Sequence, residues 1–308
     1  MLAIQQETFG APEVLRLVEV ERPEPLPTEV LVRVHAAGVN PVDWKTRTGA
    51  AFLHSLPLTV GWDVSGVVEQ VGIGVTRFRA GDEVFGMPWF PRQAGAYAQY
   101  VTAPSRHFAA KPAGLSHTEA GGLPLAGLTA WQVLVDTARV EAGQRVLVTA
   151  AAGGVGHLAV QIAKARGAYV IGTARAAKHD FLRRLGVDEA IDYTQGHPAE
   201  VARELDLVFD PMGEDSGRYL SAIKPGGMLV PFGAGGQPDV LAEARERGVR
   251  TALFLVEPDH AGLEALASLV ERGALRVEID TVLPLAEAAK AHELSEAGRA
   301  RGKIVLTV

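Results

Sequence analysis

Apolar and polar residues alternate along the first part of the chain, up to about residue 115. Val30, Val32 and Val34 alternate with residues of the opposite face, and a second β-rich run covers residues 64–71. Because successive side chains of a strand point to opposite faces, this period of two predicts strands. Glycine and proline clusters separate the runs, so we expect an irregular antiparallel barrel.

Short apolar runs alternate with helical stripes over about residues 120–270. Val155, Ala159 and Ile162 form one stripe, and Leu263 and Leu266 belong to another. The candidate strands are residues 145–149, 169–173, 190–193, 205–210, 227–232 and 250–256. Strands joined by helical crossovers predict an α/β fold with a doubly wound parallel sheet.

The chain length and its last apolar run indicate the domain organisation. The 308 residues exceed what one hydrophobic core usually organises, and the 47% hydrophobic content is enough for two cores. Residues 302–308 read as a single strand with no helix after it, which we expect to return to the first domain. The sequence therefore predicts a discontinuous domain of residues 1–120 and 275–308, and an inserted domain of residues 121–274.

Charge and composition exclude several kinds of partner. The net charge of −6 opposes binding to nucleic acid. The chain has no cysteine, which excludes disulfides and cysteine-ligated zinc, and its nine histidines are scattered, so no metal site is expected. The longest apolar run, near residues 252–256, is too short to span a bilayer. We expect a soluble cytoplasmic protein without a membrane partner.

The turn A-A-A-G-G-V-G at residues 150–156 joins a predicted strand to a predicted helix. Helix N-terminal N–H groups attract phosphate, and glycines let it approach the backbone, so the turn predicts a dinucleotide site. The contacts would come from Ala152, Gly153, Gly154, Val155 and Gly156. The first fingerprint glycine is replaced by Ala151, which leaves an ordinary glycine-rich turn as the alternative.

The segment T-A-R-A-A-K at residues 173–178 falls where such sites bind the adenosine ribose. It contains no acid, and it places Arg175 and Lys178 beside Thr173, where a 2′-phosphate would lie. This favours NADPH over NADH. The alternative is that both basic residues are solvated surface charges.

Several further motifs occur in order along the chain. They are H-A-A-G-V-N-P-V-D-W-K at 35–45, G-W-D-V-S-G-V-V at 61–68, G-D-E-V-F-G at 81–86, L-P-L-A-G-L-T-A-W at 123–131 and G-K-I-V-L at 302–306. With the glycine-rich turn, they make the chain resemble the medium-chain dehydrogenase/reductase superfamily, in its zinc-independent, zeta-crystallin-like quinone oxidoreductase branch. The resemblance implies a GroES-like catalytic barrel built from both termini and an inserted Rossmann domain.

The resemblance also bears on metal and reaction. In the zinc alcohol dehydrogenases of that superfamily, a cysteine, a histidine and a glutamate stand at the positions of Asn40, Trp62 and Asp63. Without zinc, alcohol oxidation loses its Lewis acid. The resemblance therefore implies a metal-free reductase, in which NADPH delivers hydride to a quinone or to the β-carbon of an enone.

Two residues are candidates for the acceptor side of the site. By resemblance Asn40 faces the cleft, where its amide would donate to a developing oxyanion; the alternative is a turn-forming asparagine before Pro41. Lys45 would supply charge or a proton, or is a solvated surface lysine. The tyrosine that many relatives carry shortly after the asparagine is missing.

The resemblance adds cofactor contacts outside the turn. It places Thr129 near the nicotinamide and Tyr193 near the adenosine phosphate, unless they serve as a helix-internal threonine and a packing aromatic. Gly233 and Ala234 follow a strand at the carboxyl edge of the sheet, and would face the nicotinamide.

Phe254, Val256 and Lys303 are further candidates for contact with the cofactor. Phe254 and Val256 would lie near the carboxamide and at an edge strand that pairs in a homodimer. Lys303 lies either in a solvated turn or on a cofactor phosphate.

Quinone or enone reduction is the leading hypothesis for function. An NADPH-binding structural or regulatory protein with little catalysis would keep the same fold. An enoyl-thioester reductase would need a basic entrance for the carrier phosphate, which the sequence does not locate.

Overall fold

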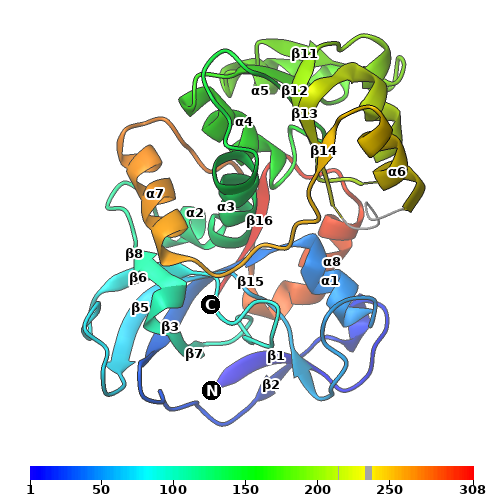
Figure 1. Ribbon diagram of the computed structural model, residues 1–308. Helices are drawn as coiled ribbons and strands as arrows, with labels where there is room; N and C mark the ends of the chain where they lie inside the picture. The colour runs from blue at the N-terminus through cyan, green and yellow to red at the C-terminus, as the bar shows by residue number, and fades with distance from the viewer. Residues whose placement is uncertain (214, 233–237) are drawn as a thin grey trace. The chain divides into compact units, whose positions relative to one another are not determined.

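The computed structural model describes residues 1–213, 215–232 and 238–308. The chain forms two compact units, here called unit 1 (Met1–Leu128 with Val256–Val308) and unit 2 (Thr129–Leu255) (Figure 1). The divisions fall after residues 128 and 255, whereas the sequence pattern predicts them after 120 and 274.

Unit 1 is built around a seven-stranded sheet of order β15-β16-β3-β5-β6-β8, with β7 also paired to β3. Its strands are β3 (Glu29–Val39), β5 (Val64–Val71), β6 (Glu83–Gly86), β7 (Tyr100–Pro104), β8 (Phe108–Ala110), β15 (Ile279–Pro284) and β16 (Lys303–Thr307). A smaller sheet joins β2 (Arg16–Glu19), β1 (Leu2–Gln6) and β4 (Leu58–Thr59). The strands predicted near residues 30–36 and 64–71 are therefore confirmed.

The return of the chain end to the first domain is also confirmed. Strand β16 pairs antiparallel with β3, with Ile304 opposite Val39 and Thr307 opposite Ala36 (Figure 1). Strand β3 is buried on both faces, since Leu31 is as inaccessible as Val30 and Val32. This is why its alternation is incomplete: interior strands need apolar residues on each face.

The helices of unit 1 are α1 (Pro41–Arg47), α2 (His117–Gly121), α7 (His260–Glu271) and α8 (Ala288–Glu296), and α3 (Pro124–Trp131) crosses into unit 2. The boundaries predicted from the sequence assign the α7 stripe to the inserted domain. In the structure α7 packs on β8, and its Glu264 pairs with Arg77 of the β5–β6 connection at 2.5 Å. The helix thus belongs to unit 1.

Unit 2 holds a six-stranded sheet of order β11-β10-β9-β12-β13-β14, in which every neighbouring pair is parallel. The strands are β9 (Arg145–Val148), β10 (Tyr169–Thr173), β11 (Glu189–Ile191), β12 (Leu205–Asp210), β13 (Ile223–Pro231) and β14 (Arg250–Thr251). All six predicted strands are present, but the last ends at Thr251 rather than at residue 256.

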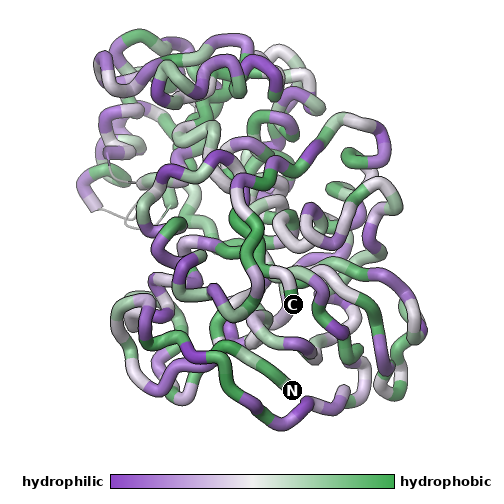
Figure 2. The backbone as a smooth tube through the Cα atoms, turned by 180° about the vertical axis from the view of Figure 1, so that it is seen from behind, coloured by the Kyte–Doolittle hydropathy of each residue, from purple (hydrophilic) through white to green (hydrophobic). Residues whose placement is uncertain are grey.

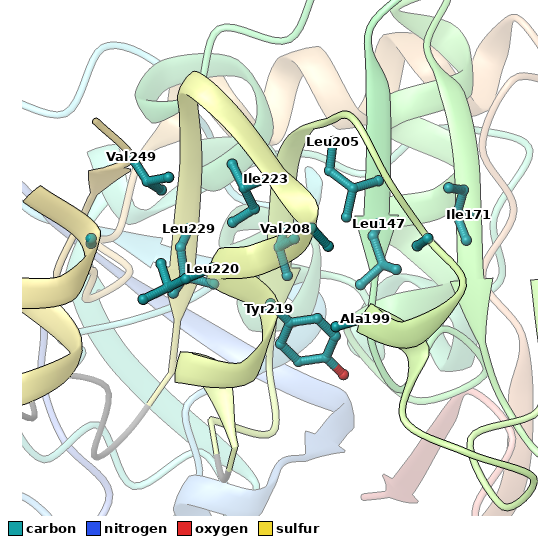
Figure 3. Packing of buried hydrophobic residues seen from close by; sticks show 13 residues of the cluster. Leu147, Ile171, Ala199, Leu205, Val208, Tyr219, Leu220, Ile223, Leu229 and Val249 are labelled. Atoms are coloured by element: carbon teal, nitrogen blue, oxygen red, sulfur yellow. The ribbon is translucent and has the colours of Figure 1, made fainter. Parts of the chain in front are cut away.

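The helices of unit 2 are α4 (Gly156–Ala165), α5 (His179–Arg184) and α6 (Pro238–Glu246), with the short helices η3 (Gln132–Thr137), η4 (Ala176–Lys178), η5 (Pro198–Glu200) and η6 (Ser216–Ala222). Figure 3 shows Leu147 of β9 and Val208 of β12 in one buried cluster with Tyr219 and Leu220 of η6. Strand order reverses between β9 and β12, and such a switch point is where doubly wound sheets bind ligands.

Hydrophobic stretches of the backbone are short and are interrupted by hydrophilic ones (Figure 2). In the three described ranges of the chain, no helix combines the length and the apolar character needed to cross a membrane.

Candidate functional site

The glycine-rich turn lies at the carboxyl end of β9 and leads directly into α4. Gly153, Gly154 and Val155 are partly exposed, whereas the two alanines directly before them are buried. A Cβ added at Gly153 would meet only the Ala150 carbonyl oxygen, at 3.2 Å. Apart from this one tight contact and the chain neighbours, no atom of the described residues lies within 4 Å of that Cβ position, next to the N-terminus of a ten-residue helix.

Gly156 has a different role, in packing. A Cβ there would collide with the Ala150 carbonyl oxygen and lie 2.7 Å from the Cα of Ala151. Only glycine lets the first turn of α4 lie this close to the end of β9. The two fingerprint glycines thus divide their tasks, since one leaves room for a ligand and the other lets the helix approach the strand.

Thr173 supports the turn from the neighbouring strand β10. Its Oγ1 accepts from the Ala150 N–H at 3.2 Å, and its carbonyl accepts from the Ala151 N–H at 3.0 Å. Ala150 has a φ of 46°, a left-handed conformation unusual for a residue with a Cβ. Because Thr173 is 2% exposed, its clearest contribution is to hold this conformation.

The structure brings together Arg175 and Tyr193, which the sequence assigned to the same phosphate. Arg175 is exposed and donates from Nε to the Tyr193 hydroxyl at 3.2 Å. Lys178 ends the short helix η4 that begins directly after Arg175. Three side chains that sequence reasoning placed on the adenosine phosphate therefore come from adjoining segments of unit 2.

Sequence reasoning missed Asp192 at this place. Its Oδ2 accepts from the Ala176 N–H at 3.1 Å, and hydrogen bonds from Thr194 and Ala176 lower its pKa. The register of the sheet, which pairs Thr173 with Ile191, brings the residues after β10 and β11 together. The alignment of two parallel strands was therefore the signal that would have located it.

In unit 1, Asn40 lies in a buried polar cluster. The residue is 2% exposed and begins α1, with Pro41 at the first helical position. Its Nδ2 donates to Oδ2 of Asp63 at 2.8 Å, and its Oδ1 accepts from the ammonium of Lys303. Both ends of the amide are therefore engaged.

Lys303 is the clearest departure from the sequence expectation. It lies in β16 with 2% exposure, so the solvated-turn interpretation is wrong. Its Nζ donates to the Val39 carbonyl at 3.1 Å and lies 3.5 Å from Oδ2 of Asp63. These contacts, with the one to Asn40, account for the three protons of the ammonium, and contact with a cofactor phosphate stays a prediction.

Burial controls the ionisation of this cluster. It raises the pKa of Asp63 and lowers the pKa of Lys303, and in each case the opposite charge of the other opposes the effect. The second oxygen of Asp63 accepts from the Leu125 N–H at 2.6 Å. Asp63 is thus held by donors on both oxygens.

Asp43 extends the cluster into α1. Its Oδ2 accepts from the Asn40 N–H at 2.7 Å and from the Tyr97 hydroxyl at 3.0 Å, while Oδ1 is buried and finds no hydrogen-bond partner among the described residues. Burial raises the pKa of Asp43 to about 7. Beyond Tyr97 lies His292, with its Nε2 at 3.4 Å from the hydroxyl, and burial lowers the pKa of His292 to about 3.

The other candidate residues are spread over both units. Lys45 is exposed on α1, with its Nζ 5.6 Å from the Trp44 ring centroid. Thr129 is 3% exposed in α3 and Val256 is 4% exposed, while Phe254 packs edge-on against Phe232 at 5.7 Å. Gly233 and Ala234 lie outside the described residues.

The residues at the positions of zinc ligands do not fit a metal ion. Trp62 is fully buried and donates from Nε1 to the Arg92 carbonyl at 2.6 Å. Asp63 shares its Oδ2 with the Lys303 ammonium, and Asn40 contributes only an amide. In the described part of the chain, no group of three or more histidine, aspartate or glutamate residues is placed to hold a metal.

Comparisons with known proteins match both parts of the chain. Residues 26–113 match the family model described as alcohol dehydrogenase GroES-like domain, and residues 185–306 match the one described as zinc-binding dehydrogenase. The chain is 35% identical over 324 residues to the 2-haloacrylate reductase of a Burkholderia species, covering 96% of each protein.

Solved structures agree over the whole chain. The quinone oxidoreductase from Coxiella burnetii has a TM-score of 0.94 and 39% identity, covering 100% of this chain and 99% of that one. Escherichia coli quinone oxidoreductase complexed with NADPH has a TM-score of 0.89 and 28% identity, with 100% of each chain covered. These matches confirm the predicted fold class, a GroES-like domain combined with a Rossmann-type parallel sheet.

Proposed function

Since the chain belongs to the quinone oxidoreductase branch of the medium-chain dehydrogenase/reductase superfamily, we propose that it is an NADPH-dependent reductase of quinones or α,β-unsaturated carbonyl compounds. The observation that carries the proposal is the partly exposed glycine backbone at Gly153, between the carboxyl end of β9 and the N-terminus of α4. A pyrophosphate meets N–H groups and no side chain in such a place.

The cofactor would be held mainly by unit 2. Gly153, Gly154 and Val155 would face the pyrophosphate, with Ala152 and Gly156 shaping the turn.

Arg175, Lys178 and Tyr193 would surround the 2′-phosphate, because a guanidinium and a lysine together favour a doubly charged anion. The similar Escherichia coli quinone oxidoreductase was solved as a complex with NADPH, which supports this choice of cofactor. The nicotinamide contacts we propose, from the family resemblance, are Thr129, Gly233, Ala234, Phe254 and Val256.

On the acceptor side, negative charge develops on oxygen when the reduced nicotinamide supplies a hydride to a quinone or an enone. Nδ2 of Asn40 carries a second hydrogen besides the one given to Asp63. We assign that N–H to the acceptor oxygen, where a prepositioned donor lowers the barrier. The exposed Lys45 is a second candidate, as a source of charge or of the proton.

The names of two relatives support the acceptor class. The Coxiella burnetii protein is a quinone oxidoreductase, and the Burkholderia protein is a 2-haloacrylate reductase. A haloacrylate and a quinone share a carbon–carbon double bond conjugated to a carbonyl group. An acceptor with this conjugation is therefore the substrate class that we propose.

Purified protein tests the proposal directly. NADPH consumption would be followed by its near-ultraviolet absorbance with a simple quinone, an α,β-unsaturated ketone and a 2-haloacrylate, each with and without chelator. We expect turnover that is unchanged by the chelator. Failure of every acceptor would contradict the proposal, and tight NADPH binding in the same preparation would then point to the structural or regulatory alternative.

We also propose a homodimer. Among the described strands, β14 pairs only with β13, and the following Leu253 and Leu255 are 71% and 47% exposed. A second copy would cover these side chains and the free strand edge. Light scattering should give about twice the 32.6 kDa chain mass, and a clean monomer at micromolar concentration would contradict it. Location in the cytoplasm stays a prediction.

A further inference from the structure

Asp210 ends strand β12 at the switch point of the parallel sheet. It is 2% exposed, and both of its oxygens accept short hydrogen bonds from hydroxyl groups. Thr149 donates from Oγ1 to Oδ1 at 2.5 Å, and Ser216 donates from Oγ to Oδ2 at 2.6 Å. The Met212 N–H adds a longer bond to Oδ1 at 3.3 Å.

Thr149 is the residue immediately before the glycine-rich turn. Its N–H donates to the Phe209 carbonyl at 3.0 Å, so its backbone and its side chain both bind the end of β12. On the other flank, Thr173 of β10 accepts from the Ala150 N–H. The start of the turn is therefore held from both neighbouring strands, by one side chain on each.

We propose that Asp210 is a positioning residue for the pyrophosphate. It fixes Thr149, and through Thr149 the left-handed Ala150 that aims the following N–H groups at the ligand. The inference rests on the proposed function only in taking the ligand to be a dinucleotide. It assigns a role in cofactor binding to a residue outside the glycine-rich turn.

The chemistry requires a carboxylate at this position. Two hydroxyl donors need two acceptor oxygens, and a carboxylate offers both in a short, charge-assisted geometry. An amide of the same shape offers one oxygen and one NH₂ group. In an Asp210→Asn variant the hydroxyl of either Thr149 or Ser216 would therefore have to turn and accept from the NH₂ group in place of its present charge-assisted donation, with little change in side-chain volume.

The variant should lose affinity only for ligands that contain the pyrophosphate. NADPH and NADH share that group, so both should bind more weakly, and by the same factor. Adenosine 2′-monophosphate lacks it and would bind through Arg175 and its neighbours alone. Its affinity should be unchanged.

The test compares dissociation constants of Asp210→Asn, Thr149→Val and wild type, measured by calorimetry for NADPH, NADH and adenosine 2′-monophosphate. We expect both dinucleotides to lose about tenfold in affinity in each variant, because binding would then have to order a turn that is prearranged in the wild type, and the monophosphate to lose nothing. Thr149→Ser keeps the hydroxyl and should restore wild-type affinity. Ser221→Ala is the matched control, since Ser221 donates to the Arg218 carbonyl at 3.2 Å, away from the turn.

Several outcomes would overturn the inference. Wild-type affinity for both dinucleotides in Thr149→Val would do so, as would an equal loss for the monophosphate, because that loss would report general damage to unit 2. Thr149→Val and Thr149→Ser decide the matter if Asp210→Asn does not fold. Failure of the wild type to bind either dinucleotide would instead contradict the proposed function.

Discussion

Nδ2 of Asn40 donates to Oδ2 of Asp63 at 2.8 Å, and the Lys303 ammonium lies 3.5 Å from the same oxygen. Since the carboxylate accepts and the ammonium donates, the two partners settle which end of the amide is nitrogen. The orientation of Asn40 is thus set by an ion pair that joins β16 to the residue before β5.

Removing the cation should weaken unit 1 strongly. The Lys303→Met variant would leave the Asp63 carboxylate buried without its counter-charge, and such losses cost about 3–5 kcal/mol. We expect the midpoint of urea unfolding to fall accordingly. Lys290→Met is the matched control, because Lys290 is exposed and its pair with Glu293 is worth about 0–1 kcal/mol. Equal stabilities of the two variants would contradict the assignment.

Asp43 should make the stability of the protein fall as pH rises. The folded protein holds the proton up to a pKa of about 7, against 3.8 for the ordinary carboxyl, so the unfolded chain binds fewer protons between these values. The free energy of unfolding therefore drops through this window, by about 4 kcal/mol in total, and levels off above it.

The Asp43→Asn variant isolates this contribution, since its amide stays neutral. Relative to wild type, the variant should gain free energy of unfolding as pH rises from about 4 to about 7, the window set by the two pKa values. Burial that lowers the pKa of His292 to about 3 acts in the opposite sense, but it is common to both proteins and cancels in the difference. Urea unfolding at several pH values measures the difference in free energy of unfolding between the two proteins. A difference that does not change with pH would count against the prediction.

The two fingerprint glycines should fail in different ways. Gly153→Val places a side chain where the pyrophosphate would lie, with a single tight contact of its Cβ to the Ala150 carbonyl oxygen at 3.2 Å, so we expect a folded protein that has lost at least about 100-fold in affinity for NADPH and NADH. Gly156→Ala drives a methyl group into the Ala150 backbone, and overpacking of this kind costs about 1–3 kcal/mol. Thermal unfolding and cofactor titration on the same samples separate the two effects. If Gly153→Val does not fold, a valine side chain does not fit at this position in the protein without a ligand.

Arg175→Ala should discriminate between the two cofactors. The variant loses a charge-assisted contact to the 2′-phosphate, worth about 1.5–3 kcal/mol, so NADPH affinity should fall by about 10- to 100-fold. NADH lacks that phosphate, so its affinity should stay close to that of wild type. Arg183→Ala is the control, because Arg183 is exposed and pairs with Asp180. Equal losses for both cofactors in Arg175→Ala would defeat the assignment.

The parallel sheet could be predicted because its inner strands, such as β9 and β12, are short apolar runs that are largely buried. Strands β10 and β12 match their predicted ranges residue for residue. For β14 the predicted range is too long, because the strand ends at Thr251. Leu253 and Leu255 continue the apolar run in the sequence, but their side chains are exposed. Apolar residues report a preference for burial, and they do not report whether a neighbouring strand is there to pair with.

The candidate site, too, could be predicted only where its residues are neighbours in the sequence. The glycine-rich turn could be predicted because its residues are consecutive and their task is local. The burial of Lys303 could not, because the residue follows two arginines in a segment that reads as solvated, and its partners Asn40 and Asp63 are far away in the chain. The burial of Lys303 depends on a carboxylate that lies far from it in the sequence.

Strand β16 lies in the interior of the larger sheet, between β15 and β3. On the ribosome, residues 303–307 emerge after the whole of unit 2, which can assemble its own sheet while unit 1 still lacks an inner strand. Until then β3 lacks its partner over Ala36–Val39, whereas its first residues are already paired with β7. A chain cut before residue 303 would therefore combine a complete unit 2 with a unit 1 that lacks one of its inner strands.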